Sequence, residues 1–234
     1  MRYLLAAILA LMLSQRAASA EEAYRVLAPS GSAPHPAVLL VPGCSGFAAS
    51  NGVNTYEERA NELQAAGYVV VFVDYVGRRS MTNCAHVSHA EVGQDIFDAA
   101  AWIRGQEGVD ADRISAIGWS YGGGGILAAL TAMPAGPPLI AKAAMYYPDC
   151  RGAMPWSASG VSALVLIGAK DDVAVPALCD KATGPSLRTI IYPNAYHAFD
   201  SRGLPERAAY PFGTLGYNAD AAKASWAAVL DFIR

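Results

Sequence analysis

The segment Gly118-Trp119-Ser120-Tyr121-Gly122 holds one serine between two glycines, and three more glycines follow it directly. Because each glycine inside a helix or strand costs about 0.5–1 kcal/mol, so many in succession indicate a special backbone geometry. Apolar runs before and after the segment place the serine between a predicted strand and a predicted helix. That is the context of a nucleophile elbow, a tight turn that exposes a serine hydroxyl at a helix N-terminus, where developing negative charge is favoured.

Two other interpretations of this glycine-rich turn involve no nucleophile: a turn that only packs, and a loop that holds phosphate. A phosphate loop would need Gly-Lys followed by Ser or Thr, or Gly-x-Gly-x-x-Gly after the first strand, and the chain has neither in those places. We therefore predict that Gly118 and Gly122 allow strand and helix to approach closely and that Ser120 is a nucleophile. The later glycines would let the first helical turn pack against its neighbours.

A serine hydroxyl is a weak nucleophile until a base removes its proton, and the base needs a carboxylate to orient it. In this strand-turn-helix arrangement the order along the chain is serine, acid, histidine. His197 is the only histidine after Ser120, so it is the predicted base, with a surface histidine as the alternative. The acid is expected after the preceding strand, where Asp171 and Asp172 are both available. Asp171 comes first and is preferred, and Asp172 would then be a solvated neighbour or a cap.

Backbone N–H groups would stabilise the oxyanion that forms when a nucleophile attacks a carbonyl. One is expected from Tyr121, directly after the serine, and one from the loop Val-Pro-Gly-Cys-Ser-Gly, where Cys44 is the candidate. A nucleophilic Cys44 is a competing interpretation, but this cysteine lacks a glycine-framed elbow. We thus predict an oxyanion hole formed by the backbone N–H groups of Cys44 and Tyr121.

Six apolar runs without polar alternation predict buried strands, and amphipathic segments separate several of them. The predicted strands are residues 37–43, 68–75, 113–119, 140–148, 162–170 and 187–193. Helices are predicted from capping boxes at Thr55 and Ser88, from residue 125 onward, and over 218–234 with Asn218 as N-cap. This pattern predicts an α/β fold, a mainly parallel sheet with helices on both faces.

Residues 1–20 have the features of a secretory signal peptide: a basic start at Arg2, a short apolar stretch and a small-residue ending, Ala-Ser-Ala. A membrane anchor is the alternative, but the apolar stretch is too short for a bilayer of roughly 30 Å and Arg16 interrupts it. We therefore expect a secreted or periplasmic protein without a stable membrane anchor, in which residues 21–234 form one domain.

The composition, 53% hydrophobic and 16% charged, is typical of a folded globular protein. Removal of residues 1–20 takes away two arginines and no acid, so 15 basic and 20 acidic residues remain, a formal charge of −5 that does not favour nucleic acid. His86 and His89 have a spacing found in metal sites, but no third ligand is evident, so we assign them to the surroundings of a helix cap. No metal or organic cofactor is expected.

Four cysteines, Cys44, Cys84, Cys150 and Cys179, could form two disulfides in an exported chain, with three possible pairings. The first two follow neighbouring early strands and the last two follow neighbouring late strands, so all four are expected near the carboxyl edge of the sheet. We predict a Cys44–Cys84 bridge and a Cys150–Cys179 bridge, each bracing loops around the site. Free buried thiols are the alternative.

Five blocks of the sequence resemble the dienelactone hydrolase family of α/β-hydrolases. They are AVLLVPGCSGF, AAGYVVVFVDYVGRR, DRISAIGWSYGGGG, LIGAKDDVAVP and YPNAYHAFD, and they span most of the chain after the signal peptide. The resemblance implies an α/β-hydrolase fold and maps the family's triad onto Ser120, Asp171 and His197. Members that cleave dienelactone use a cysteine nucleophile and a glutamate on the first oxyanion loop, where this chain has Ser120 and Pro-Gly-Cys. The resemblance therefore implies ester chemistry more strongly than dienelactone cleavage.

Arginines near the site bind the substrate carboxylate in those members, and Arg78, Arg79 and Arg202 lie in similar neighbourhoods here. The resemblance thus makes these three arginines candidate substrate-binding residues, with ordinary surface charges as the alternative. The stretch Gly-Trp-Ser-x-Gly-Gly-Gly-Gly is also similar to the elbow of secreted polyester hydrolases, which supports an ester substrate without identifying it.

Together these features predict a serine hydrolase, a carboxylic ester hydrolase similar to dienelactone hydrolases. Its Ser-His-Asp triad would cleave small-molecule esters or lactones through an acyl-enzyme intermediate. A small peptidase or amidase with the same triad is one alternative. A non-catalytic binding protein of the same fold is another, although such a protein has no need of serine, acid and histidine in this order.

Overall fold

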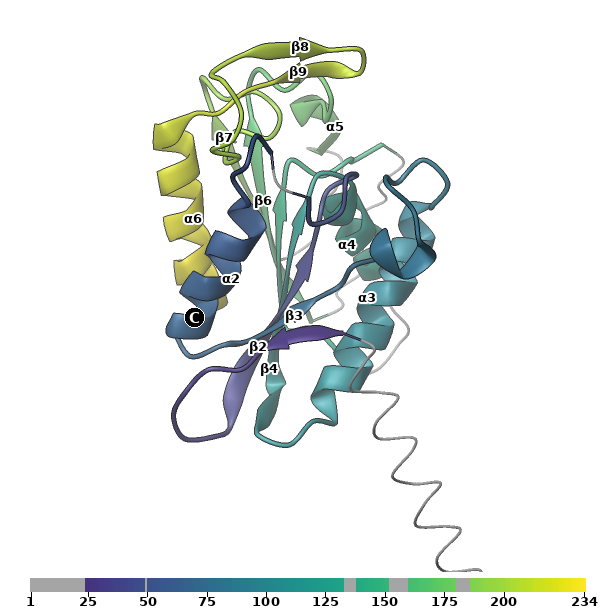
Figure 1. Ribbon diagram of the computed structural model, residues 1–234, viewed down its shortest axis with the longest axis vertical. Helices are drawn as coiled ribbons and strands as arrows, with labels where there is room; N and C mark the ends of the chain where they lie inside the picture. Colours follow the sequence, from purple (N-terminus) through teal and green to yellow (C-terminus); the bar gives the residue numbers. More distant parts are fainter. Residues whose placement is uncertain (1–23, 49, 133–137, 152–159, 180–185) are drawn as a thin grey trace, which may run out of the picture.

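The computed structural model describes residues 24–234 except residue 49 and segments 133–137, 152–159 and 180–185. The predicted signal peptide lies outside the described residues. Within them, seven strands form one sheet in the order β1-β3-β2-β4-β5-β6-β7 (Figure 1). No helix in this part of the chain combines the length and the apolar character needed to cross a bilayer.

Neighbouring strands of the main sheet are parallel except for β1, which pairs antiparallel with β3. The bounds are β1 (Arg25–Leu27), β2 (His35–Val41), β3 (Val69–Phe72), β4 (Val109–Trp119), β5 (Lys142–Tyr146), β6 (Ser162–Gly168) and β7 (Leu187–Tyr192). A hairpin of β8 (Ala208–Tyr210) and β9 (Gly213–Leu215) forms a separate antiparallel pair. The six predicted strands correspond to β2 through β7, so the mainly parallel sheet is confirmed.

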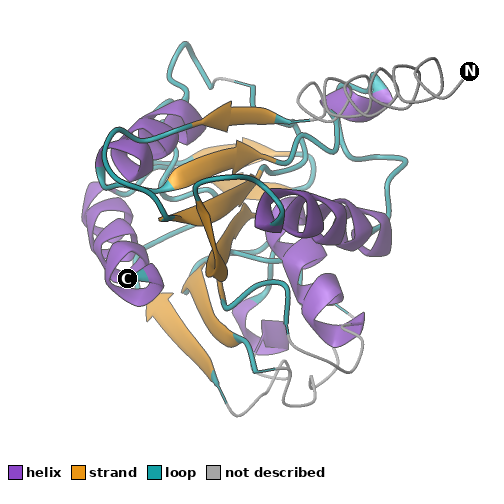
Figure 2. Ribbon diagram, turned by 90° about the horizontal axis from the view of Figure 1, so that it is seen from below, coloured by secondary structure: helices purple, strands orange, loops and turns teal. Residues whose placement is uncertain are grey.

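Helices cover both faces of the sheet (Figures 1 and 2). Their bounds are α2 (Thr55–Ala65), α3 (His89–Arg104), α4 (Tyr121–Ala132), α5 (Pro176–Cys179) and α6 (Ala219–Ile233), with a short 3-10 helix η1 (Gly77–Arg79). Helices α2 and α6 pack on one face, and α3 and α4 pack on the other (Figure 1). Strands covered on both faces have no solvent side, which is why residues 37–41 of β2 are all apolar and fully buried.

The N-terminal caps show how far local sequence decides where helices begin. Ser88 caps α3 in a complete capping box, and Asn218 caps α6, as predicted. The prediction for α2 was wrong by one residue, because Asn54 rather than Thr55 is the N-cap, and its side chain accepts the Glu57 N–H. Asparagine is at least as good an N-cap as threonine, so the helix gains one residue at its start.

Several short elements were not predicted, namely β1, η1, α5 and the β8–β9 hairpin. None of them exceeds four residues, and a hydrophobic periodicity needs a longer window to become visible. They form only because longer elements hold them: β1, for example, pairs with the already buried strand β3. These elements therefore depend on tertiary contacts.

Helices α3 and α4 approach each other closely because both carry glycine at their contact. A Cβ at Gly125 would lie 2.3 Å from Val92 Cγ1, and a Cβ at Gly93 would lie 3.2 Å from the backbone nitrogen of Ala129. The first distance is far inside van der Waals contact, so a side chain at Gly125 would force the helices apart. The glycine run after Ser120 thus serves helix packing, as its position suggested.

Two disulfides connect loops at the carboxyl edge of the sheet: Cys44 with Cys84, and Cys150 with Cys179. These are the two pairs expected from the strand order. The first bridge joins the segments after β2 and β3, and the second joins the segment after β5 to α5, which follows β6. Because the strands of each pair are neighbours, each bridge ties two adjacent loops together.

Removal of either disulfide by paired Cys→Ser substitutions should lower the free energy of unfolding by about 3–4 kcal/mol, since the bridges span 40 and 29 residues. Urea unfolding followed by tryptophan fluorescence measures this loss. The exposed Ser186→Ala variant is the control and should remain within about 0.5 kcal/mol of wild type. A loss below about 1 kcal/mol for both bridges would contradict the bracing role.

Candidate active site

Ser120 lies in the turn between β4 and α4 and has a left-handed backbone conformation, with φ at 49°. A residue with a side chain in this conformation is strained by about 1–3 kcal/mol. The Ser120 N–H donates to the Tyr146 carbonyl, and the Gly124 N–H donates to the Ser120 carbonyl, both at 2.9 Å. The turn therefore has the backbone of a nucleophile elbow and holds Ser120 at the carboxyl edge of the sheet.

Gly118 and Gly122 allow the close approach that this turn needs. A Cβ at Gly122 would lie 2.3 Å from the Pro42 carbonyl oxygen, and a Cβ at Gly118 would lie 2.7 Å from Ile126 Cδ1. No real Cβ tolerates the first contact with a rigid backbone atom, so a side chain at Gly122 would separate β2 from α4. The glycine-framed serine is thus explained by the steric demands of the turn.

Ser120, His197 and Asp171 form a line of hydrogen bonds. The Nε2 atom of His197 lies 2.9 Å from Ser120 Oγ, and its Nδ1 atom lies 2.9 Å from Asp171 Oδ2. The side chains of His197 and Asp171 are both buried. With a proton on Nδ1, the imidazole donates to Asp171 and its Nε2 can accept the proton of Ser120.

The two neighbouring aspartates face different partners. Asp171 directs one oxygen to His197, while its other oxygen accepts two backbone N–H groups at 2.9 and 2.8 Å. Asp172 instead accepts the backbone N–H and the hydroxyl of Thr214, at 2.7 and 3.0 Å. The bond from the Thr214 backbone is the main reason why the pKa of Asp172 is lowered. Asp171 is therefore the carboxylate that can orient His197, and Asp172 instead holds strand β9 through Thr214.

The loop after β2 is held by two tyrosines. The Gly43 N–H donates to the Tyr56 hydroxyl at 3.0 Å, and the Gly43 carbonyl accepts the Tyr75 hydroxyl at 2.9 Å. Cys44 follows Gly43 and lines the cavity that contains the predicted nucleophile. Tyr121 is the first residue of α4, so its N–H has no acceptor within the helix. The N–H groups of Cys44 and Tyr121 thus remain the candidate oxyanion donors.

A cavity of about 180 Å³ opens beside Ser120. Its walls come from the loop after β2, the start of α2, the elbow, the loop that carries His197 and the β8–β9 hairpin. Most of the lining side chains are apolar or aromatic, including Val53, Trp119, Tyr147, Leu204, Phe212 and Leu215. An apolar cavity of roughly 150 Å³ holds one benzene molecule, so a larger ligand must extend beyond the cavity mouth.

Asp200 is a buried carboxylate in the cavity wall that sequence reasoning missed. Only 2% exposed, it accepts the Trp119 indole N–H at 2.9 Å and the Tyr147 hydroxyl at 2.6 Å. Burial raises the pKa of this carboxyl. The Tyr147 ring centroid lies 4.5 Å from that of His197, so Asp200 holds an aromatic ring against the imidazole. In the sequence only its place three residues after His197 distinguishes Asp200 from a surface aspartate.

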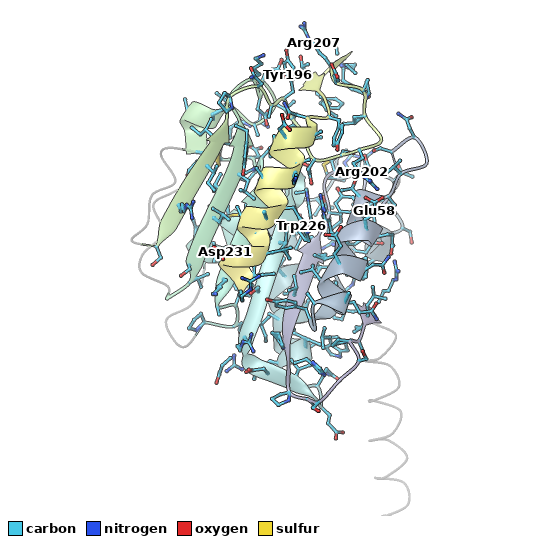
Figure 3. All side chains as sticks on the ribbon, turned by 90° about the vertical axis from the view of Figure 1, so that its left-hand side faces the viewer. Glu58, Tyr196, Arg202, Arg207, Trp226 and Asp231 are labelled. Atoms are coloured by element: carbon cyan, nitrogen blue, oxygen red, sulfur yellow. A yellow bond between two sulfur atoms is a disulfide. The ribbon has the colours of Figure 1, made fainter. Side chains whose placement is uncertain are left out.

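The three arginines proposed to bind substrate have partners elsewhere. Their partners are Tyr24 for Arg78 (3.0 Å), Asp95 for Arg79 (2.6 Å) and Glu58 for Arg202 (Figure 3). None of the three lines the cavity beside the predicted nucleophile. This geometry favours the alternative reading, in which they are ordinary surface charges, because each guanidinium already has a partner outside the site.

His89 is the first residue of α3 and follows its N-cap, Ser88. Its ring centroid lies 4.1 Å from that of Tyr121, and burial lowers the pKa of its imidazole. Across the described ranges, no group of three or more His, Cys, Asp or Glu side chains is arranged to hold a metal ion. His89 thus lies beside a helix cap and packs behind the elbow.

These features together define the α/β-hydrolase class. The sheet is mainly parallel and covered by helices on both faces, a serine elbow follows one strand, and an acid and a histidine follow two later strands. The model of the dienelactone hydrolase family matches residues 22–234. The chain therefore belongs to the dienelactone hydrolase family, as the five sequence blocks indicated. A search of curated protein sequences finds no match.

Several solved structures share this fold. A protein of Klebsiella pneumoniae assigned as a dienelactone hydrolase is 19% identical, with a TM-score of 0.69 over 87% of this chain and 88% of that one. A dienelactone hydrolase-like promiscuous phosphotriesterase from metagenomic libraries is 20% identical, with a TM-score of 0.61 over 87% of each chain. Esterase 2 of Thermogutta terrifontis, phosphoramylated by tabun, is 16% identical, with a TM-score of 0.62 over 90% and 88%. At these identities the likeness concerns the fold.

Replacement of Asp200 by alanine should lower the free energy of unfolding by about 2–5 kcal/mol, because two buried donors lose their acceptor. Tyr147→Phe removes one donor together with its bond and should cost only about 1 kcal/mol. Asp231→Ala is the control, because Asp231 is exposed on α6 (Figure 3) and should change stability by less than about 0.5 kcal/mol. Denaturant unfolding measures all three, and a loss for Asp200→Ala no larger than the control would contradict this role.

Proposed function

We propose that the protein is a serine hydrolase that cleaves small-molecule carboxylic esters or lactones through an acyl-enzyme intermediate. The observation that carries the proposal is the pair of hydrogen bonds that connects Ser120, His197 and Asp171. The distance is 2.9 Å both from Ser120 Oγ to His197 Nε2 and from His197 Nδ1 to Asp171 Oδ2. This line of hydrogen bonds ends at the serine of a strained elbow and faces a cavity, which is the constellation that acyl transfer requires. Membership of a hydrolase family supports the reaction class.

In the first half of the proposed reaction, Ser120 Oγ attacks the carbonyl carbon while His197 Nε2 accepts its proton. Asp171 keeps the imidazole oriented and stabilises the imidazolium that forms. The oxyanion accepts hydrogen bonds from the backbone N–H groups of Cys44 and Tyr121. The N–H group of Tyr121 lies at the positive end of the α4 dipole. The tetrahedral intermediate then collapses, and His197 gives its proton to the leaving alcohol.

In the second half, water attacks the carbonyl carbon of the acyl-enzyme and His197 accepts a proton from that water. Collapse of the second intermediate releases the carboxylic acid, and the proton on His197 returns to Ser120. With a lactone substrate, the alcohol and the acid remain parts of one product. Only protons and electron pairs move in this cycle, so the proposed residues account for every bond made and broken.

We further propose that the protein acts outside the cytoplasm, as a secreted or periplasmic enzyme. Residues 1–20 have the sequence features of a cleavable export signal. The two disulfides support the same location, because such bonds persist in oxidising compartments and are rare in the cytosol.

Ser120→Ala, His197→Ala and Asp171→Asn should each lower kcat/KM for a chromogenic ester by about a thousandfold to a millionfold, since the triad acts as one unit. The assay uses the oxidised protein without residues 1–20 and a panel of short and long acyl esters. Ser186→Ala and Asp231→Asn are matched controls, because both residues are exposed and neither lines the cavity. Both controls should keep wild-type rates.

Different outcomes of this assay separate the candidate functions. Ester turnover that survives Ser120→Ala would contradict the proposed nucleophile. Hydrolysis of an amide but not of the ester with the same acyl group would favour the amidase alternative. If the wild-type protein cleaves neither, the binding-protein alternative would be favoured.

Phosphorus esters provide an independent test of the nucleophile, because one structural neighbour is a promiscuous phosphotriesterase and another is phosphoramylated by tabun. Diethyl p-nitrophenyl phosphate should label the protein once, on the peptide that contains Ser120, because the activated hydroxyl attacks phosphorus as it attacks a carbonyl. Intact-protein and peptide mass spectrometry measure the label and its position. Labelling should vanish in Ser120→Ala and slow by about a hundredfold or more in His197→Ala. A single label at another residue would contradict the proposal.

A further inference from the structure

The β8–β9 hairpin carries two exposed aromatic side chains at the mouth of the cavity. Phe212 is 62% exposed and Tyr210 is 39% exposed, and their rings stack with centroids 5.6 Å apart and planes 23° apart. Phe212 also lines the cavity that contains Ser120. The hairpin lies across the carboxyl edge of the main sheet, at the top in Figure 1. The aromatic pair is therefore an outward continuation of the cavity wall.

This hairpin is fixed to both loops that carry the histidine and the acid. Asp172 accepts two hydrogen bonds from Thr214 of β9, at 2.7 and 3.0 Å. On the other side, Leu215 forms a bridge with His197, and the Gly216 N–H donates to the His197 carbonyl at 3.0 Å. These contacts come from the backbone and from a charged side chain, so they hold the hairpin in a defined place. Its exposed rings are thus presented on a fixed support.

The cavity itself is unsuited to a negatively charged group. Among the described residues, no lysine or arginine lines it, and its one carboxylate, Asp200, already accepts two hydrogen bonds. Lys170 and Arg207 lie outside the cavity, with their cationic groups 5.6 and 5.7 Å from the ring centroid of Tyr196. Tyr196 and Arg207 are labelled in Figure 3. An anion that entered this cavity would lose its hydration shell, and no cationic side chain in the wall would replace it. The cavity therefore complements an uncharged ligand.

We propose that Phe212 and Tyr210 form a binding subsite for the apolar part of an uncharged ester, an aromatic ring or an aliphatic chain that projects from the cavity. This inference rests on the proposed ester hydrolysis and adds the class of substrate. The cavity holds the reacting ester and one small group, and the remainder of the substrate lies along the two stacked rings. Contact with the substrate removes exposed apolar surface from water, which favours binding.

The test compares two series of esters: ethyl acetate against ethyl octanoate for the acyl side, and ethyl acetate against benzyl acetate for the alcohol side. Phe212→Ala should lower kcat/KM about tenfold for the longer member of at least one series, the effect of losing roughly 50 Å² of apolar contact. The loss for ethyl acetate should be several-fold smaller than the loss for the longer ester, because ethyl acetate fits within the cavity and contacts less of the Phe212 ring. Ile191→Ala is the matched control, since Ile191 is 46% exposed on the edge strand β7 and does not line the cavity.

Equal losses for every ester, or no loss for either longer ester, would overturn the subsite. Binding of benzyl acetate to Ser120→Ala, measured by calorimetry with and without Phe212→Ala, separates the subsite from the proposed chemistry. Weaker binding in the double variant supports the subsite even if no ester is hydrolysed. Unchanged binding together with normal ester turnover overturns the subsite and leaves the proposed function standing. Ethyl hydrogen succinate, which carries a carboxylate, should be a poorer substrate than ethyl butyrate, and the reverse order would also overturn it.

Discussion

The left-handed backbone of Ser120 is the constraint on which the rest of the structure depends. A strained residue persists only where its surroundings over-determine it, and here the Tyr146 carbonyl and the packing of β2 and β4 against α4 do so. A side chain at Gly118 or Gly122 would relieve the strain by separating strand from helix. The Ser120 hydroxyl would then leave its place 2.9 Å from His197. The glycines therefore keep strand and helix close enough to hold the Ser120 hydroxyl beside His197.

A parallel sheet brings the other parts of the site to the same edge, because the loops after β4, β6 and β7 all emerge there. Loops alone would leave these side chains loosely placed, and cross-links between neighbouring loops restrain them. The two disulfides tie the loops after β2 and β5 to their neighbours, and the hydrogen bonds from Asp172 to Thr214 attach the hairpin. The site therefore depends on contacts between neighbouring loops as well as on the sheet that carries them.

Two buried carboxylates near His197 have different tasks because they face different donors. Asp171 faces the imidazole and can stabilise its cationic form, while Asp200 faces the neutral donors of Trp119 and Tyr147. Hydrogen bonds satisfy both groups, which is the condition for keeping a carboxylate out of water. The first carboxylate is therefore placed to orient and stabilise the imidazole, and the second holds aromatic side chains of the cavity wall. Through this second arrangement Asp200 holds Trp119 and Tyr147 in the aromatic wall of the cavity.

The sequence by itself determined the features that depend on chain order and local backbone preference. Apolar runs predicted the parallel sheet, the glycines predicted the elbow, and Ser88 and Asn218 were recognisable as helix caps. Only the tertiary structure brought Asp171, and not Asp172, next to His197, placed the arginines away from the cavity, and revealed Asp200 and the hairpin. Neighbouring aspartates have the same local signal, and short strands have no periodicity. Their roles depend on contacts between side chains of loops that are distant in the chain. A local sequence pattern does not predict such contacts.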